Sequence, residues 1–253
     1  MRVLLTGASG ELGGALALAY AQAGAELSLW GRDEPRLARI AAACAAAGSA
    51  RTQVRALDLA DINASIAALA LEDDAAPFDI ALFASGLGDI RAEGAVVEAA
   101  TQVAQLGIVN FASPAALAAE LATRMTRRGS GQIVFIGSAA AFHALPFATA
   151  YAASKAGLAR FADALRINVA PHGVRVTLVS PGFIDTAAAR SVPGPKPLAM
   201  SAQQAASRIV RAAARGKAHL VMPWPFAALR LIDRALPRFV RDRLLRSLTP
   251  PER

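Results

Sequence analysis

Short apolar runs alternate along the chain with longer stretches in which apolar residues recur at helical spacing. Seven of the short runs predict strands, at residues 3–6, 26–30, 53–57, 80–83, 132–136, 175–179 and 220–222. The longer stretches predict helices, among them residues 12–22, 152–169 and 202–215. Strands that alternate with helices are typical of an α/β fold, because each crossover helix covers one face of a parallel sheet. The pattern therefore predicts a doubly wound parallel sheet with helices on both faces and with its ligand-binding loops along one edge.

The pattern changes after Met222, where a basic, amphipathic helical pattern begins. We expect residues 1–222 to form one cofactor-binding and catalytic domain and residues 223–253 to be a helical extension of it, broken at Pro237. Two interpretations of this extension are open. It packs on the domain or on a partner subunit, or it attaches peripherally to an anionic membrane surface with Trp224 and Phe226 at the interface.

Charge and composition narrow the classes of partner. The net charge of +8 predicts attraction to a polyanion, such as a phosphorylated cofactor or a membrane surface, or else reflects only a well-solvated surface. The chain has no zinc-finger spacing and no aromatic-basic RNA motif, so no nucleic acid is expected. One cysteine, Cys44, and scattered histidines predict neither a disulfide nor a metal site. The absence of a long apolar run and of a signal-peptide pattern predicts a cytoplasmic protein, with the inner face of the membrane as the alternative location.

A glycine-rich segment, T-G-A-S-G-E-L-G-G at residues 6–14, joins the first predicted strand to the first helix. Glycines allow a pyrophosphate to approach the backbone closely, and free N–H groups at a helix start attract an anion. The segment predicts a phosphate-binding turn, although a simple tight turn would look similar. The candidate residues are Gly7, Ser9, Gly10, Leu12 and Gly13.

The end of the second strand bears on the choice of dinucleotide. An acidic residue there would accept hydrogen bonds from the ribose 2′-hydroxyl of NAD. This chain has Gly31 followed by Arg32, and a guanidinium pairs well with the 2′-phosphate of NADP. Asp33 allows NAD as the alternative, or it begins a helix cap. NADP is therefore the expected cofactor, and Asp58 after the third strand is expected to reach the adenine or to cap a helix.

Tyr151 and Lys155 stand four residues apart on a predicted helix, which places both on one face. A neighbouring ammonium stabilises a phenolate, so we expect Lys155 to lower the pKa of Tyr151. Ser138 follows the strand at residues 132–136, where its hydroxyl would hydrogen-bond a substrate oxygen, unless it serves only as a turn residue. These three residues predict acid–base chemistry at a carbonyl or alcohol group.

Together, in this order and spacing, these motifs make the chain resemble a short-chain dehydrogenase/reductase over residues 3–222. The resemblance implies a Rossmann-like fold and hydride transfer between NAD(P) and a small carbonyl or alcohol compound. It implies that Tyr151 is the general acid/base, that Lys155 also holds the nicotinamide ribose, and that Ser138 orients the substrate. It further implies that the protein is a homodimer or a homotetramer. The remaining residues that match the family are Asn110 as a relay residue, Asp58, Leu59, Ala84 and Gly86 near the dinucleotide, and Pro181, Gly182, Ile184 and Thr186 around the nicotinamide.

Two segments depart from the family pattern. Glu11 stands where the commonest glycine pattern has its middle glycine, and F-A-S-G at residues 83–86 replaces the usual N-N-A-G. Neither change removes a catalytic group. The alternatives to an active NADP-preferring oxidoreductase are a non-catalytic dinucleotide sensor or scaffold, and a nucleotide-sugar epimerase or dehydratase. The short segment after Thr186 leaves little chain for a sugar-nucleotide domain.

Overall fold

Seven parallel strands form the central sheet of the protein, whose residues 1–88, 92, 94–192, 194–228 and 236–247 are described by a computed structural model. The strands lie in the order β3-β2-β1-β4-β5-β6-β9. The predicted doubly wound sheet is confirmed, and each predicted strand end agrees with the structure to about two residues. The strands are β1 (Arg2–Thr6), β2 (Glu26–Gly31), β3 (Arg51–Ala56), β4 (Ile80–Phe83), β5 (Gly131–Ile136), β6 (Val174–Pro181) and β9 (His219–Met222).

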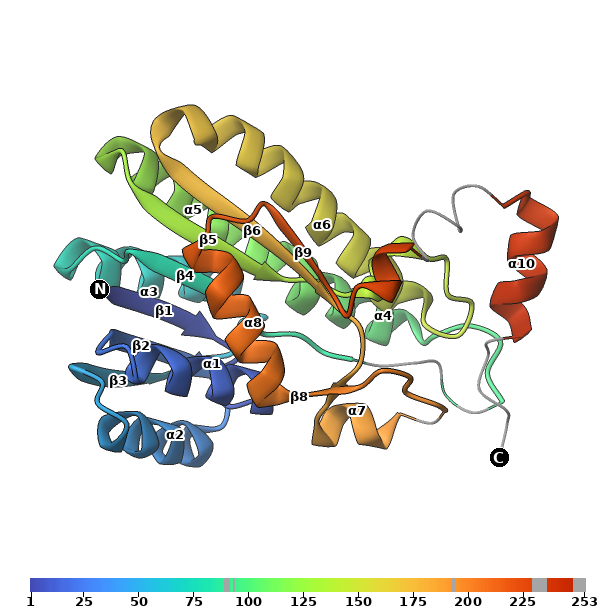
Figure 1. The fold of residues 1–253 in the computed structure, drawn as a ribbon, viewed down its shortest axis with the longest axis horizontal. Helices are drawn as coiled ribbons and strands as arrows, with labels where there is room; N and C mark the ends of the chain where they lie inside the picture. The colour runs from blue at the N-terminus through green and yellow to red at the C-terminus, as the bar shows by residue number, and fades with distance from the viewer. Residues whose placement is uncertain (89–91, 93, 193, 229–235, 248–253) are drawn as a thin grey trace.

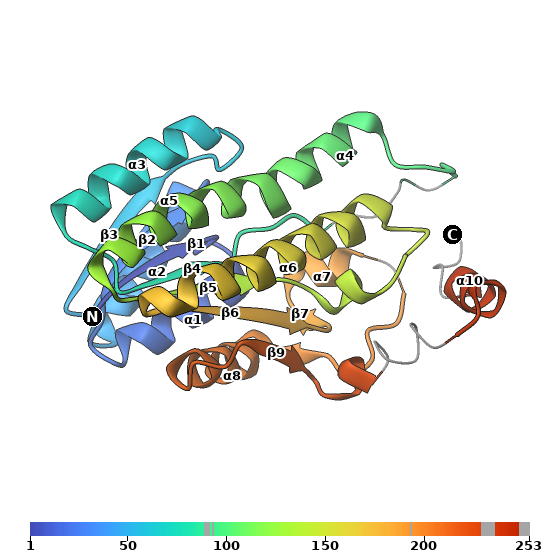
Figure 2. The same ribbon diagram turned by 90° about the horizontal axis from the view of Figure 1, so that it is seen from above.

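Two layers of helices cover the sheet (Figures 1 and 2). One layer consists of α1 (Glu11–Ala21), α2 (Glu34–Ala46) and α8 (Ala202–Ala214), and the other of α3 (Ile62–Ala75), α5 (Ser113–Arg128) and α6 (Thr149–Val169). Side chains alternate between the faces of a strand, so successive residues enter different cores. In β1, Val3 and Leu5 pack in the core under α1 and α8, whereas Leu4 packs in the core under α5 and α6.

A continuous helical run, residues 100–128, is long and apolar enough by length and composition to cross a membrane. It consists of α4 (Ala100–Gly107), a π-helical turn η1 (Ile108–Ala112) and α5. Of its most apolar window, 56% is buried inside the fold. This burial is what a helix that covers a sheet requires, so the apolar character of the run is explained by the core.

The order of the strands reverses between β1 and β4. The chain leaves β1 toward α1 on one face and leaves β4 toward α4 on the other, so the carboxyl ends of these two strands form a topological switch point. Ligands of open α/β sheets bind at such a switch point. It lies beside the glycine-rich segment, as the sequence predicts.

A small second sheet lies beyond β6. It pairs β7 (Ile184–Asp185) with β8 (Met200–Ser201), and the short helix α7 (Ala187–Ser191) lies between them. Ser201 begins α8 with a reciprocal cap, because its hydroxyl accepts the Gln204 N–H and the Gln204 side chain accepts the Ser201 N–H. The segment around the predicted nicotinamide pocket is therefore partly ordered.

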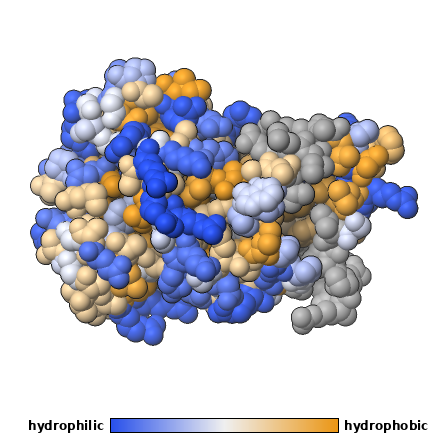
Figure 3. Space-filling view, in the orientation of Figure 1, coloured by the Kyte–Doolittle hydropathy of each residue, from blue (hydrophilic) through white to orange (hydrophobic). Residues whose placement is uncertain are grey.

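The helical extension is described in part. Helix α10 (Arg238–Ser247) begins directly after Pro237, the residue where the sequence predicted a break. The parts of the predicted helical extension at residues 229–235 and 248–253 lie outside the described residues. The division of the chain into a domain and an extension at Met222 stays a prediction. Figure 3 shows hydrophobic and hydrophilic side chains side by side at the end of the molecule that carries α10. Phe239 on α10 is 78% exposed and Trp224 is 76% exposed.

Candidate active site

The glycine-rich segment turns tightly from β1 into α1. Gly7 has a φ of +70°, and a Cβ atom there would lie 2.6 Å from the backbone of Ser85 in the neighbouring loop. A Cβ atom on Gly13 would lie 2.1 Å from the carbonyl oxygen of Gly7. Gly10 occupies the N-cap of α1 without a side-chain cap, so no side chain at the N-cap accepts from the first N–H groups of the helix. This cradle fits a pyrophosphate, and Leu12 packs beside the core behind it.

The end of β2 lies against this cradle. A Cβ atom on Gly31 would lie 2.8 Å from the Ser9 hydroxyl, so glycine here makes room for the cradle itself. Asp33 is occupied as the cap of α2, because it accepts the Arg36 N–H at 2.9 Å and forms an ion pair with the Arg36 side chain at 3.1 Å. Arg32 is exposed and forms no ion pair with any residue that the structure describes. The guanidinium of Arg32 is therefore available to a ligand at the end of β2, whereas the carboxylate of Asp33 is already bonded to Arg36.

The loop after β3 carries two of the predicted contacts. Asp58 is exposed and accepts the Ala60 N–H at 3.0 Å, whereas Leu59 is buried. Asp61 is the residue that caps α3, by accepting the Ala64 N–H at 3.0 Å. The Asp58 carboxylate is thus placed at the rim of the sheet and is not consumed by the helix cap.

The loop after β4 passes close to Asn110 and Lys155, two of the predicted catalytic residues. A Cβ atom on Gly86 would lie 3.2 Å from both the Lys155 Nζ atom and the Asn110 Oδ1 atom. Ala84 precedes it at the end of β4, and the neighbouring Ser85 hydroxyl is 3.0 Å from that of Thr6 in β1. In this segment, which lacks the asparagines of the family pattern, a contact between the Thr6 and Ser85 hydroxyls joins the loop to β1. The absence of a side chain at Gly86 leaves room for the Lys155 ammonium.

Ser138 and Tyr151 meet at the carboxyl end of β5, where their hydroxyl groups are hydrogen-bonded. Ser138 is 9% exposed, and its Oγ atom also accepts the Ala140 N–H at 3.1 Å. Burial raises the pKa of Tyr151, and the hydrogen bond with Ser138 lowers it by less. The net shift of this pKa is therefore upward and the predicted lowering is wrong, because loss of solvation outweighs the contact with Ser138.

Lys155 follows one turn later on α6 and is 5% exposed. Its ammonium donates to the Ile136 carbonyl at 3.0 Å. Burial lowers the pKa of Lys155 from its ordinary value of 10.5 to about 8. Among the described residues no carboxylate forms an ion pair with it. The site therefore holds a buried cation whose charge the fold does not neutralise.

Asn110 lies fully buried in the π-helical turn η1, a feature often found at functional sites. Its Oδ1 atom accepts the Leu87 N–H at 2.7 Å, and its Nδ2 atom donates to the Leu87 carbonyl at 2.9 Å. Nδ2 also lies 3.3 Å from the Ser154 hydroxyl. The side chain of Asn110 thus ties the loop after β4 to α6, next to the lysine that the family relay would serve.

The segment after β6 carries the four residues that are predicted to lie around the nicotinamide. A Cβ atom on Gly182 would lie 2.3 Å from the ring of Phe226, so this glycine makes room for a side chain of the protein. Thr186 caps α7 by accepting the Ala189 N–H at 3.1 Å. Pro181 ends β6 and Ile184 begins β7, which keeps both near the carboxyl edge of the sheet. The four residues therefore lie near this edge, and their role at the nicotinamide stays a prediction.

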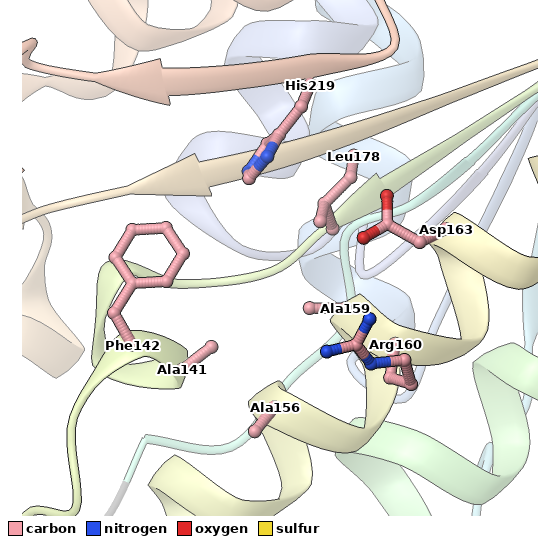
Figure 4. A pocket seen from close by; sticks show the side chains of 8 residues that line it. All are labelled: Ala141, Phe142, Ala156, Ala159, Arg160, Asp163, Leu178 and His219. Carbon is pink, nitrogen blue, oxygen red and sulfur yellow. The ribbon is translucent and has the colours of Figure 1, made fainter. Parts of the chain in front are cut away.

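A cavity of about 140 Å³ lies farther along α6, between that helix, β6 and β9 (Figure 4). Arg160, Asp163 and His219 point into it, and Ala156 forms part of the wall. None of the predicted site residues lines it. Pockets for drug-sized ligands measure about 300–1,000 Å³, so this cavity is too small for a dinucleotide.

Two acidic residues contact the site in ways that the sequence did not indicate. Glu11, where the family has a glycine, accepts the Ala187 N–H at the start of α7 at 2.6 Å. Glu98 is 7% exposed and accepts the Ala150 N–H at 3.0 Å. Both contacts join segments that are far apart along the chain, so spacing alone could not reveal them.

Known proteins share this sequence and architecture. A family model described as short chain dehydrogenase matches residues 1–196. An uncharacterized oxidoreductase of Myxococcus xanthus is 31% identical over 247 residues, which cover 97% of this chain and 96% of the relative. One of Mycobacterium tuberculosis is 34% identical over 251 residues, covering 96% and 97%. A solved short-chain dehydrogenase from Sphingobium yanoikuyae in complex with NADPH is 25% identical, with a TM-score of 0.81 and coverage of 94% and 96%.

Proposed function

The chain belongs to the short-chain dehydrogenase/reductase family, and from this we propose that it is an NADP-preferring reductase of a small carbonyl compound, with Tyr151 as the general acid. Its membership makes it an NAD(P)-dependent oxidoreductase. The single observation that carries the finer proposal is the hydrogen bond between Ser138 and Tyr151, one helical turn from the buried Lys155.

The reaction requires a proton for the substrate oxygen. Ser138 and Tyr151 present two hydroxyl groups at the carboxyl end of β5, where a carbonyl oxygen can accept from both. Tyr151 then donates its proton, and the ammonium of Lys155 stabilises the negative charge left on the phenol. A bound nicotinamide dinucleotide would supply the hydride. In the reverse direction the phenolate would take the proton from an alcohol.

The cradle formed by Gly7, Gly10 and Gly13 would hold the pyrophosphate, and Arg32 would pair with the 2′-phosphate of NADP. The exposed Arg32, with Asp33 engaged as a helix cap, supports this preference. We expect Arg32→Ala to weaken NADPH binding about tenfold or more and to leave NADH binding within about twofold. Arg208→Ala, which removes an exposed arginine of α8, is the matched control. Equal effects of Arg32→Ala on both dinucleotides would refute the preference.

A panel of carbonyl compounds, with NADPH oxidation as the readout, tests the activity. Tyr151→Phe is expected to lower turnover by about 100-fold or more and to leave dinucleotide binding unchanged. Full turnover in that variant would overturn the role of Tyr151. A wild-type chain that binds a dinucleotide and reduces no carbonyl would favour the sensor or scaffold alternative, and interconversion of nucleotide sugars would favour an epimerase.

The partners and location of the protein stay proposals. A homodimer or homotetramer in the cytoplasm is the assembly expected of the family. The exposed Trp224 and Phe239, together with the arginines of α10, suit either a partner subunit or an anionic membrane surface. Liposome sedimentation of the full chain and of a chain that ends at Pro223 separates the two, because equal binding would exclude a membrane role for the extension.

A further inference from the structure

The carboxylate of Glu98 lies at the amino end of α6, the helix that carries Tyr151 and Lys155. One carboxylate oxygen accepts the Ala150 N–H at 3.0 Å, and the other accepts the hydroxyl of Thr149. Glu98 is 7% exposed, so these two donors replace most of its contact with water. A buried carboxylate without such donors would be strongly unfavourable, so Glu98 and the end of α6 hold each other in place.

Helix α6 has no side-chain cap of its own. Its N-cap residue is Ala148, which has no side-chain acceptor, although the first N–H groups of a helix need acceptors. Glu98, 52 residues earlier than Ala150, supplies one from a different segment. Its negative charge is also favourable at the positive end of the helix dipole. Ala150 directly precedes Tyr151, so the contact fixes the backbone next to the proposed acid.

The segment that carries Glu98 is attached to α6 a second time. It leaves β4 beside Lys155, and Asn110 binds both the N–H and the carbonyl of Leu87. Asn110 also contacts the hydroxyl of Ser154 on α6. The loop between β4 and α4 therefore meets α6 on the amino side of Tyr151 through Glu98 and on its carboxyl side through Asn110. Together the two attachments restrict both translation and rotation of the helix turn that carries the phenol.

We propose that Glu98 is a positioning residue that holds the amino end of α6, so that the phenol of Tyr151 stays in hydrogen-bonding reach of Ser138. This proposal rests on the proposed function, in which Tyr151 donates the proton. A shift of about 1 Å in a reacting group lowers the rate by up to about 100-fold. Within the part of the chain that the structure describes, Glu98 hydrogen-bonds Thr149 and Ala150 and none of the residues assigned to the dinucleotide, so we expect the loss to fall on kcat and not on KM.

Kinetics of the full chain test the proposal with two variants of Glu98 and one control. Glu98→Ala is expected to lower kcat about 10- to 100-fold and to leave the KM values for carbonyl and NADPH within about twofold. Glu98→Gln keeps an oxygen that accepts from Ala150 and should retain more than about a third of kcat. Asp61→Ala removes a comparable cap from α3 and should keep the wild-type kcat. An unchanged kcat in Glu98→Ala, or equal losses in Glu98→Ala and Asp61→Ala, would overturn the proposal.

Amide hydrogen exchange tests Glu98 without any turnover. In Glu98→Ala the first turn of α6 should exchange about tenfold faster or more, while its second half keeps its protection. Unchanged exchange overturns the proposal whatever the activity. If the wild type reduces no carbonyl but the first turn of α6 still exchanges faster in Glu98→Ala than in the wild type, only the proposed function is overturned.

If Glu98→Ala does not fold, Glu98→Gln and Thr149→Val, which removes one of the two donors, decide the question. Faster exchange of the first turn in Thr149→Val than in the wild type supports the proposal. Wild-type exchange in both of these variants refutes it.

Discussion

The burial of Lys155 predicts a stability cost that depends on pH. The pKa of this ammonium falls from 10.5 to about 8 on folding, because the charged form loses water. Between these two values the unfolded chain holds more protons than the folded one, so stability rises with pH across this window. Below about pH 8 the cost is fully present, and above about pH 10.5 it is relieved. Replacement of Lys155 by methionine removes this titration.

The size of the effect follows from the shift. The pKa of Lys155 falls by about 2.5, and at about 1.4 kcal/mol for each pH unit this corresponds to a loss of about 3 kcal/mol in the free energy of unfolding. The variant also loses the hydrogen bond to the Ile136 carbonyl, which costs about 1 kcal/mol at any pH. We therefore expect Lys155→Met to be about 2 kcal/mol more stable than the wild type near pH 7 and about 1 kcal/mol less stable near pH 10.5.

Urea unfolding of wild type and variant at several pH values measures this difference directly. Because Tyr151 titrates nearby, the comparison is repeated with both chains carrying Tyr151→Phe, so that any coupled titration cancels. Lys217→Met removes an exposed lysine, and its free energy of unfolding should differ from that of the wild type by an amount that does not change with pH. If the difference in unfolding free energy between Lys155→Met and its parent is also independent of pH, the burial cost inferred for Lys155 is wrong.

Four further predictions concern other parts of the molecule. Glu72→Ala leaves the buried donors around this carboxylate without their acceptor and should destabilise the protein by about 3–5 kcal/mol in urea unfolding; a loss below about 1 kcal/mol would contradict this. Gly13→Ala should abolish dinucleotide binding in fluorescence titration, whereas Gly24→Ala, with φ +72° and open space, should bind normally and lose only about 1 kcal/mol of stability. Cys44 is fully buried and its pKa is raised to about 11, so native protein should resist thiol labelling that proceeds in urea. Because the pKa of Tyr151 is raised, alcohol oxidation should accelerate with increasing pH through neutrality while carbonyl reduction stays level, and parallel pH profiles would contradict this.

The sheet was predictable because most of its strands are short, apolar and buried on both faces; the edge strand β3 is the polar, partly exposed exception. Such runs stand out from the alanine-rich helices, and the order strand–helix–strand leaves few topologies to consider. The cradle at Gly7 and Gly13 was predictable for a related reason, because a positive φ and a close backbone approach require glycine. Local conformation and periodicity therefore carried most of the fold and the phosphate-binding part of the site.

Contacts between distant segments were not predictable in this way. Glu98 stands in the sequence as one charged residue in a small apolar stretch, and its partner Ala150 is 52 residues away. Gly182 was predicted to lie around the nicotinamide, and nothing in the sequence indicated that the ring of Phe226 lies against it. Only the folded chain defines which side chain fills each space. A sequence motif identifies a glycine or a carboxylate, but it does not predict which residues contact it in the folded protein.

The pKa of Tyr151 shows why spacing alone can give the wrong sign. The interval between Tyr151 and Lys155 correctly places a cation one turn away, but it contains no information on burial. In the folded protein Lys155 donates to the Ile136 carbonyl, and the loss of water around the phenol outweighs the hydrogen bond from Ser138. The phenol is therefore protonated at neutral pH, and a protonated phenol is the form that donates to a carbonyl oxygen. The same burial that reverses the predicted shift thus keeps Tyr151 in the proton-donating form that the proposed reduction requires.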